Sequence, residues 1–99
     1  MEIVWDEPKR QTNLRDHRLD FVDGRDRFSF AGAVVMPTYP GKDGRKRFMA
    51  IGLLDTRLIT IVFSPLGTEG ISLISMRRAG RSERRLYERS QETRHSRNL

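Results

Sequence analysis

The stretch from Ile71 to Ser90, ISLISMRRAGRSERRLYERS, contains the sharpest change from apolar to basic residues in the chain. Its first five residues are mostly aliphatic or β-branched, which is typical of a strand inside a sheet. The sequence then becomes strongly basic, and Gly80 interrupts it. Ser82 followed by Glu83 is typical of a helix N-terminus, with Ser82 as the cap. The stretch therefore predicts a buried strand that ends in arginines and leads into a basic helix.

Three further strands are predicted upstream by apolar runs that lie between turn signals. Residues 33–36 form the first run, which is expected to end before Pro37, and a strong turn follows it. Residues 47–54 and 58–63 form the next two runs, and the later one is rich in β-branched side chains. Strands joined by such short turns must be antiparallel. With the run at residue 71, the sequence predicts a four-stranded meander.

The N-terminal third predicts one short strand and two helices. Residues 1–5 are largely apolar and form the strand candidate, and Asp6 is a good N-cap for a helix that ends near His17. A second, short helix is expected over residues 20–28, again with an aspartate as its cap. The order strand, helix, helix, meander, helix predicts an α+β domain. Its antiparallel sheet should carry the two N-terminal helices on one face.

The composition limits the chain to one small domain. Residues 1–93 are expected to form it, and residues 94–99 are expected to be a frayed basic tail. No cysteine is present, so neither disulfides nor thiolate metal sites are available. No apolar stretch approaches the roughly 20 residues that span a membrane, and the N-terminus lacks the features of a signal peptide. A cytoplasmic location is therefore expected.

The positive charge is concentrated near the C-terminus. The chain carries a formal charge of +6, and eight of its 19 Lys/Arg residues but only three of its 13 Asp/Glu residues lie after residue 75. Arginine outnumbers lysine 16 to 3. Arginine binds phosphate bidentately and stacks on bases, so this bias favours a nucleic acid or an acidic protein surface as partner. A GC-rich genome would produce the same bias, so composition alone leaves both explanations open.

Several short motifs occur in an order and spacing that resembles the BrnT family. They are Trp5-Asp6-Glu7, Lys9, Asn13, His17, Phe21, Phe28, Ile51-Gly52, Ile74-Ser75-Met76-Arg77-Arg78-Ala79, Glu83-Arg84 and Tyr87. The resemblance covers about residues 3 to 88 and implies a RelE-like fold and a ribonuclease toxin of a type II toxin–antitoxin module. It further implies an RNA substrate and a BrnA-type antitoxin, a DNA-binding protein that represses its own operon. No cofactor is implied, and a homodimer is left open.

Two positions depart from the family pattern. The family usually has glycine after the histidine, where this chain has Arg18, which puts a left-handed helix cap there in question. The last strand often carries an arginine where this chain has Ser72. If that arginine contacts substrate in relatives, Arg57 or Arg47 replaces it here or the contact is missing.

RNA cleavage by this class resembles attack of the ribose 2′-OH on its own phosphate, and arginines can stabilise the charge that develops. No metal-binding motif is present to suggest a metal-dependent route. Four residues are predicted as catalytic. Arg77 follows the last strand, where RelE-like toxins place an arginine, and Arg47 and Arg57 each begin a strand. His17 suits acid–base chemistry, although its place at a predicted helix C-terminus favours an interaction with the helix dipole instead.

Further residues are predicted to bind RNA without acting in the reaction: Arg78, Arg81, Lys46 and Tyr87. Arg78 alternates with Arg77 along the strand and should point the other way. A rival function is a nucleic-acid-binding or protein-interaction module without catalysis, such as a degenerate toxin. The departure at Ser72 and the lack of an obvious acid–base pair support that rival.

Overall fold

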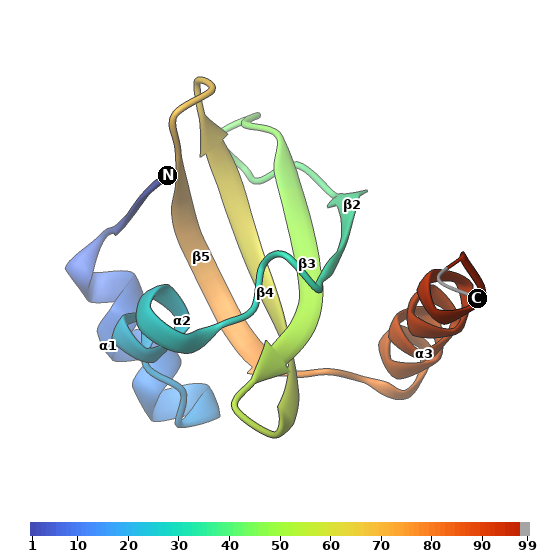
Figure 1. Cartoon of the computed structure of the whole chain (residues 1–99). Helices are drawn as coiled ribbons and strands as arrows, with labels where there is room; N and C mark the ends of the chain where they lie inside the picture. The colour runs from blue at the N-terminus through green and yellow to red at the C-terminus, as the bar shows by residue number, and fades with distance from the viewer. Residues whose placement is uncertain (98–99) are drawn as a thin grey trace.

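The computed structural model describes the backbone of residues 1–97 and the side chains of residues 1–94. A five-stranded sheet lies between two N-terminal helices on one side and a C-terminal helix on the other (Figure 1). In chain order the elements are β1 Glu2–Trp5, α1 Glu7–His17, α2 Phe21–Arg27, β2 Val34–Thr38, β3 Arg47–Leu54, β4 Arg57–Leu66, β5 Gly70–Arg78 and α3 Arg81–Arg97. The predicted element order is therefore confirmed.

The sheet is mixed, which corrects the prediction of a purely antiparallel one. Its strands lie in the order β1-β5-β4-β3-β2, and β2 to β5 form the predicted antiparallel meander. Strand β1, however, pairs with β5 in parallel, with Ile3 opposite Ile71. Turn lengths fix the direction of strands that follow one another, whereas β1 and β5 are the first and last strands of the chain. The sequence therefore carried no local signal for their pairing.

Three strands end two or three residues beyond their predicted positions: β4 ends at Leu66 and not at residue 63, and β2 and β5 are also longer. Strand β2 continues through Pro37, which pairs with Phe48 of β3. The proline is tolerated because β2 is an edge strand, so its missing N–H removes no ladder bond to a further neighbour. Strand β5 extends to Arg78, so Arg77 and Arg78 lie within the strand, where the prediction had placed them after it.

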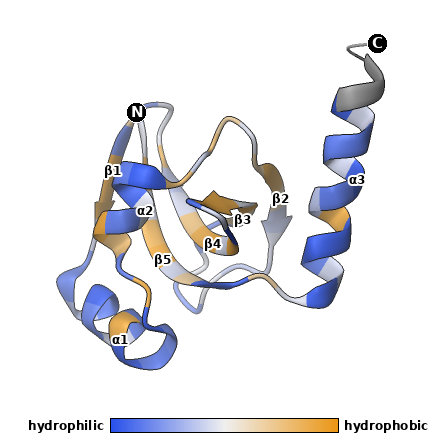
Figure 2. Cartoon of the chain, turned by 60° about the horizontal axis from the view of Figure 1, so that its bottom comes forward, coloured by the Kyte–Doolittle hydropathy of each residue, from blue (hydrophilic) through white to orange (hydrophobic). Residues whose placement is uncertain are grey.

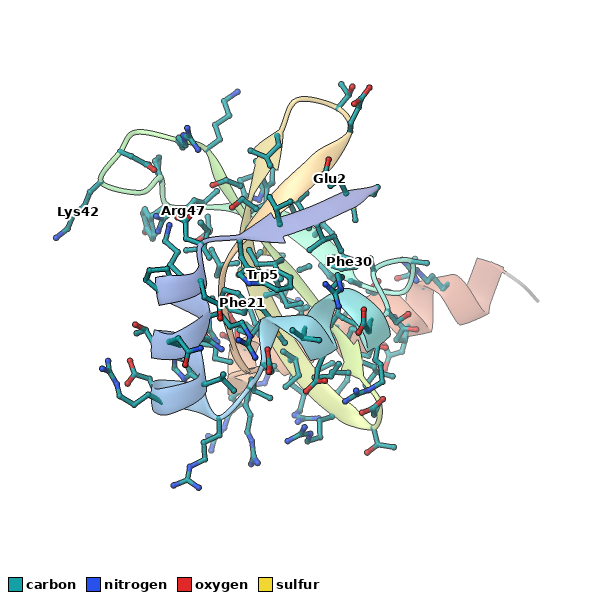
Figure 3. The ribbon with its side chains drawn as sticks, turned by 90° about the vertical axis from the view of Figure 1, so that its left-hand side faces the viewer. Glu2, Trp5, Phe21, Phe30, Lys42 and Arg47 are labelled. Carbon is teal, nitrogen blue, oxygen red and sulfur yellow. The ribbon has the colours of Figure 1, made fainter. Side chains whose placement is uncertain are left out.

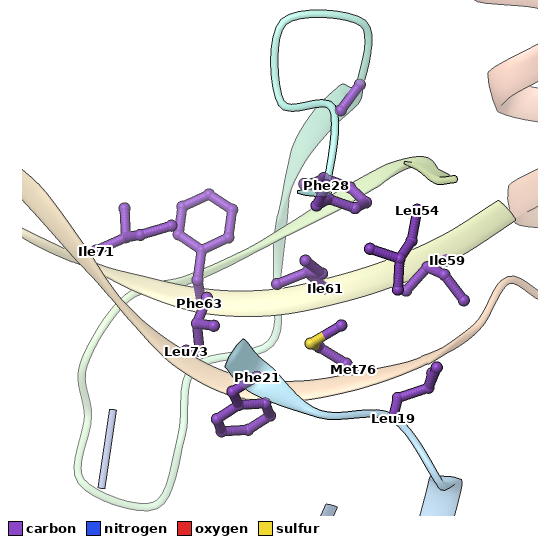
Figure 4. Packing of buried hydrophobic residues seen from close by; sticks show 12 residues of the cluster. Leu19, Phe21, Phe28, Leu54, Ile59, Ile61, Phe63, Ile71, Leu73 and Met76 are labelled. Carbon is purple, nitrogen blue, oxygen red and sulfur yellow. The ribbon is translucent and has the colours of Figure 1, made fainter. Parts of the chain in front are cut away.

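The main core lies between α2 and the sheet (Figure 4). Phe21 of α2 is fully buried, and its ring meets Trp5 edge-on with 6.0 Å between the ring centres. Gly24 of the same helix faces Met76 so closely that a Cβ atom there would lie 2.7 Å from the Met76 sulfur. The glycine that weakens α2 by propensity thus allows the helix to lie directly on the sheet.

Helix α1 lies beside the part of β5 that β1 leaves unpaired. The buried Asn13 accepts a hydrogen bond of 2.9 Å from the Met76 backbone N–H and donates one of 2.9 Å to the Leu19 carbonyl. The helix ends at Arg18, which adopts the left-handed conformation (φ 58°, ψ 31°) and donates its N–H to the Leu14 carbonyl. The cap that an arginine had put in question is therefore present.

Helix α3 lies on the far side of the sheet from α1 and α2 (Figure 1), and the part of it that Figure 2 colours is mostly hydrophilic. It begins at Arg81, one residue before the predicted cap Ser82. It continues to Arg97 and so includes much of the tail that was expected to be frayed, whereas residues 98–99 lie outside the described part of the chain. No helix among the described residues is long and apolar enough to cross a membrane.

Candidate functional site

A cleft of about 480 Å³ lies at the end of the sheet from which α3 departs. Its walls come from the turn between β3 and β4, from the end of β5 and from one side of α3. The lining residues are Leu53, Thr56, Arg57, Leu58, Arg78, Ala79, Arg84, Tyr87 and Glu88. This volume falls in the range of small-ligand sites. The cleft thus brings together three of the predicted site residues, Arg57, Arg78 and Tyr87.

Three arginines line the cleft, and each comes from a different element: Arg57 from β4, Arg78 from β5 and Arg84 from α3. Among the side chains that the structure describes, no carboxylate forms a salt bridge with any of the three. Several arginines elsewhere in the fold are paired with carboxylates, as Arg10 is with Asp20 and Arg27 with Asp55, whereas others, such as Arg45 and Arg89, form no salt bridge with a described side chain. The cleft therefore presents guanidinium groups whose donors are available to an anionic ligand.

Helix α3 contributes a phenol and a carboxylate to the same cleft. Tyr87 is half-buried, and Glu88 is exposed beside it. Arg84 and Glu88 lie one helical turn apart, so both face the same wall. The sequence reasoning missed Arg84 and Glu88 as site residues. The signal that could have found them is the helical spacing from Arg84, with Tyr87 three residues and Glu88 four residues further on. This spacing is inconspicuous in a basic helix with few apolar residues.

A partly buried ion pair lies next to the cleft. Arg77 of β5 and Thr60 of β4 are directly paired across the sheet, so their side chains share a face. Glu83 of α3, only 8% exposed, reaches both: each of its oxygens accepts a 2.7 Å hydrogen bond from Arg77, and Oε1 also accepts from the Thr60 hydroxyl at 3.0 Å and the Gly80 N–H at 2.8 Å. The Arg77 guanidinium lowers the pKa of Glu83 to about 2, with help from the Gly80 and Thr60 donors.

Arg77 is therefore placed differently from the predicted arginine that faces solvent at a strand end. Two of its nitrogens face Glu83, and about 38% of its side chain stays exposed. Arg78 pairs with Ile59, whereas Arg77 pairs with Thr60, so the two arginines point to opposite faces as predicted. It is Arg78, and not Arg77, that lines the cleft.

Lys46 and Arg47 lie at the opposite end of the sheet. Arg47 is the first residue of β3, whereas Arg57 pairs with Leu54, the last one, so roughly 24 Å of strand separates the two levels. Figure 3 shows Arg47 at the end of the molecule where the loop between β2 and β3 lies, together with Lys42 of that loop. Both predicted residues line a hollow of about 300 Å³ there, and the buried Arg47 Nε has no hydrogen-bond partner among the described residues. They cannot contact the same phosphate as Arg57.

The two remaining predicted residues are also outside the cleft lining. His17 is exposed at the end of α1 and lines a separate groove of about 270 Å³ with Lys9, Asp16 and Ser75. Arg81 is exposed at the first residue of α3. The structure thus does not bring His17 to the cleft arginines, and the cleft takes its titratable groups from α3.

In this small α+β domain, arginines without a carboxylate partner among the described side chains lie beside a phenol and a carboxylate, which is a set of groups suited to binding an anion such as phosphate. Residues 5–83 match the model of a family described as the ribonuclease toxin BrnT of type II toxin–antitoxin systems. Because the match includes most of the chain, the protein belongs to that family. A search of curated protein sequences finds no match.

A solved structure supports the same assignment. The chain is 46% identical to the ribonuclease toxin BrnT of Brucella abortus, whose crystal structure was determined at 1.1 Å resolution. The alignment covers 82% of this chain and 99% of the Brucella chain, with a TM-score of 0.66. The family match ends at Glu83, so α3 beyond its first turn lies outside it.

Proposed function

We propose that the chain is an endoribonuclease that needs no metal, and that the arginine cleft binds the phosphate that is cut. The observation that carries this proposal is the convergence of Arg57, Arg78 and Arg84 on one cleft, in a chain that belongs to a ribonuclease toxin family. In the proposed reaction a ribose 2′-OH attacks the adjacent phosphate. The guanidinium groups match the phosphate oxygens and stabilise the charge that builds up on the phosphorane.

Tyr87 and Glu88 are the proton-transfer groups of this proposal. The Glu88 carboxylate can accept the proton of the attacking 2′-OH, and the Tyr87 hydroxyl can donate one to the leaving 5′ oxygen. The Tyr87 ring also offers a surface on which a base can stack. Arg81, Lys46 and Arg47 lie outside the cleft and extend the basic surface along a longer RNA strand. His17 stays a weaker candidate, because it lines a different groove.

The family assignment implies a protein antitoxin, and we propose that it is of the BrnA type and blocks the cleft. Acidic side chains of such a partner would complement the cleft arginines and speed the encounter between the two proteins. Inhibition should then be competitive with RNA, and association should slow between low and physiological salt, because exposed charges are screened over about 8–10 Å. Tight binding of the antitoxin to a chain already saturated with RNA would place the inhibitory surface elsewhere.

The mechanism can be tested with purified protein in EDTA. The chain should cut RNA and leave a 2′,3′-cyclic phosphate or a 3′-phosphate, and a 2′-deoxyribose at the cut site should abolish cleavage because the nucleophile is gone. Arg57→Ala and Arg78→Ala should each lower kcat by roughly 10²-fold or more, the cost of losing one charge-stabilising donor. Arg89→Ala removes the same charge from an exposed position of α3 outside the cleft and is the control. A strict need for a divalent ion would contradict the mechanism.

A further inference from the structure

Glu83 does not line the cleft, yet its carboxylate binds residues of two strands beside it. We infer that Glu83 is a positioning residue: with Arg77 and Thr60 it fixes α3 across the end of the sheet and so builds one wall of the cleft. The inference rests on the proposed function, because it assigns Glu83 a task in binding the same RNA. It goes beyond that proposal in giving Arg77 an indirect role.

The first support is the scarcity of other contacts that could orient α3. The helix is polar on most of its surface, and its apolar seam consists of Leu86 and Tyr87, which are only half-buried. Two side-chain contacts with the loop before β2 are long: Gln91 and Arg94 each donate to backbone carbonyls at 3.4 Å. A helix with so thin a seam gains little from packing, so its direction must be set elsewhere.

The second support is the number of elements that meet at the Glu83 carboxylate. Its four hydrogen bonds come from β4 through Thr60, from β5 through Arg77 and from the start of α3 through Gly80. The Gly80 contact is the half of a capping box in which the third helical residue reaches back to the first free N–H. One carboxylate therefore fastens two strands to the helix N-terminus, and it is ionised across the physiological range because Arg77 holds its pKa far below the ordinary value.

The third support is what lies next along the helix. Arg84 follows Glu83 directly, and Tyr87 and Glu88 follow one turn later on the wall of the cleft. If the hydrogen bonds of Glu83 to the sheet break, α3 moves and these three side chains leave the cleft together. Arg57 and Arg78 remain in place because they belong to strands. The free protein would then spend only part of its time with a complete cleft. The apparent affinity for RNA is then reduced in proportion to the fraction of molecules that have a complete cleft, whereas the RNA-bound molecules all have a complete cleft.

Loss of the Glu83 contact should therefore change KM for RNA much more than kcat. Glu83→Ala should raise the KM for RNA tenfold or more and leave kcat within about threefold, and Arg77→Ala should do the same. A direct role in the chemistry would lower kcat, and simple loss of folded protein would lower the apparent kcat with KM unchanged. Glu83→Gln keeps the shape and the acceptor for Gly80 but loses the charge that Arg77 needs, so it should fall between wild type and Glu83→Ala.

Hydrogen exchange supplies a readout that does not depend on RNA. In Glu83→Ala the amides of α3 should exchange at least tenfold faster, while those of β4 keep their protection. Glu92→Gln is the matched control, because it removes a carboxylate from an exposed position of the same helix. Unchanged α3 protection in both Glu83 variants, or a fall in kcat at constant KM when β4 protection shows that the protein is fully folded, would overturn the inference. If the wild-type chain cuts no RNA, the proposed function fails, and exchange still decides whether Glu83 positions α3.

Discussion

Helices α2 and α3 lie on opposite sides of one sheet and are attached to it by different kinds of contact. Helix α2 is fixed by apolar packing, with Phe21 fully buried and Gly24 pressed against Met76. Helix α3 has few apolar residues, and its Glu83 accepts four hydrogen bonds that tie the start of the helix to β4 and β5. The difference separates two tasks. Apolar burial stabilises the domain, whereas a polar attachment places a helix while leaving its other arginines available to an anion.

The largest expected effect is on the apolar side. Phe21→Ala removes a fully buried ring from the core and should lower the free energy of unfolding by about 3–5 kcal/mol. That is a large share of the roughly 5–15 kcal/mol that holds a typical domain together. Urea denaturation followed by the fluorescence of Trp5, which contacts the Phe21 ring, measures the change directly.

The comparison requires that truncation on the α3 side cost much less. Leu86→Ala shortens one of the two half-buried apolar residues of α3 and is the matched variant. It should cost well under half of the Phe21→Ala effect, because a half-buried side chain removes less apolar surface from water. Equal losses for the two variants would show that α3 is held by packing after all.

The next effect is the acid sensitivity of the α3 attachment. The folded-state pKa of Glu83, about 2, lies below its ordinary value of 4.5. A depressed pKa means that the ionised carboxylate stabilises the folded form above about pH 4.5, and this contribution is lost as the pH falls toward 2. At one pKa unit per 1.36 kcal/mol, the attachment weakens by up to about 3 kcal/mol over that window.

Carbon-13 NMR of the Glu83 carboxyl group tests this effect at its source. Its titration midpoint should lie well below the ordinary value, and Arg77→Ala should move it upward because Arg77 is the main cause of the shift. Asp20, which caps α2 and pairs with Arg10, also has a lowered pKa, so the titration must be followed at Glu83 itself and not through unfolding of the whole domain. An ordinary midpoint in the wild type would show that the Arg77–Glu83 contact is not maintained in solution.

The apolar half of the molecule could be predicted from the sequence. Apolar runs between turn signals placed the meander, and aspartates in cap positions placed α1 and α2 close to their observed bounds. The parallel pairing of β1 with β5 could not be predicted, because it joins the two ends of the chain without a connecting turn. The extension of β2 through Pro37 was missed for a related reason: whether a strand lies at an edge depends on the whole sheet.

The candidate site was predicted only in part. Arg57, Arg78 and Tyr87 were singled out, and they do meet in the cleft. Arg47 and Arg57 were grouped because each begins a strand, but β3 and β4 are antiparallel, so the two residues lie at opposite ends of the sheet. Arg77 and Glu83 were considered separately, since a contact six residues apart across a strand-to-helix turn has no fixed spacing rule.

The smallest expected effect concerns the connection between α1 and α2, on the apolar side of the comparison. Arg18 adopts a left-handed conformation with φ 58°, which costs a residue with a side chain about 1–2 kcal/mol. Arg18→Gly removes that strain but adds about 0.5–1 kcal/mol of backbone entropy to be lost on folding. The net result should be a gain in stability of about 0.5–1 kcal/mol, measured by urea denaturation. Arg15→Gly, the control with the same charge change inside α1, should instead destabilise the protein by about 1 kcal/mol. If both substitutions destabilise the chain, Arg18 is held by contacts that outweigh its backbone strain.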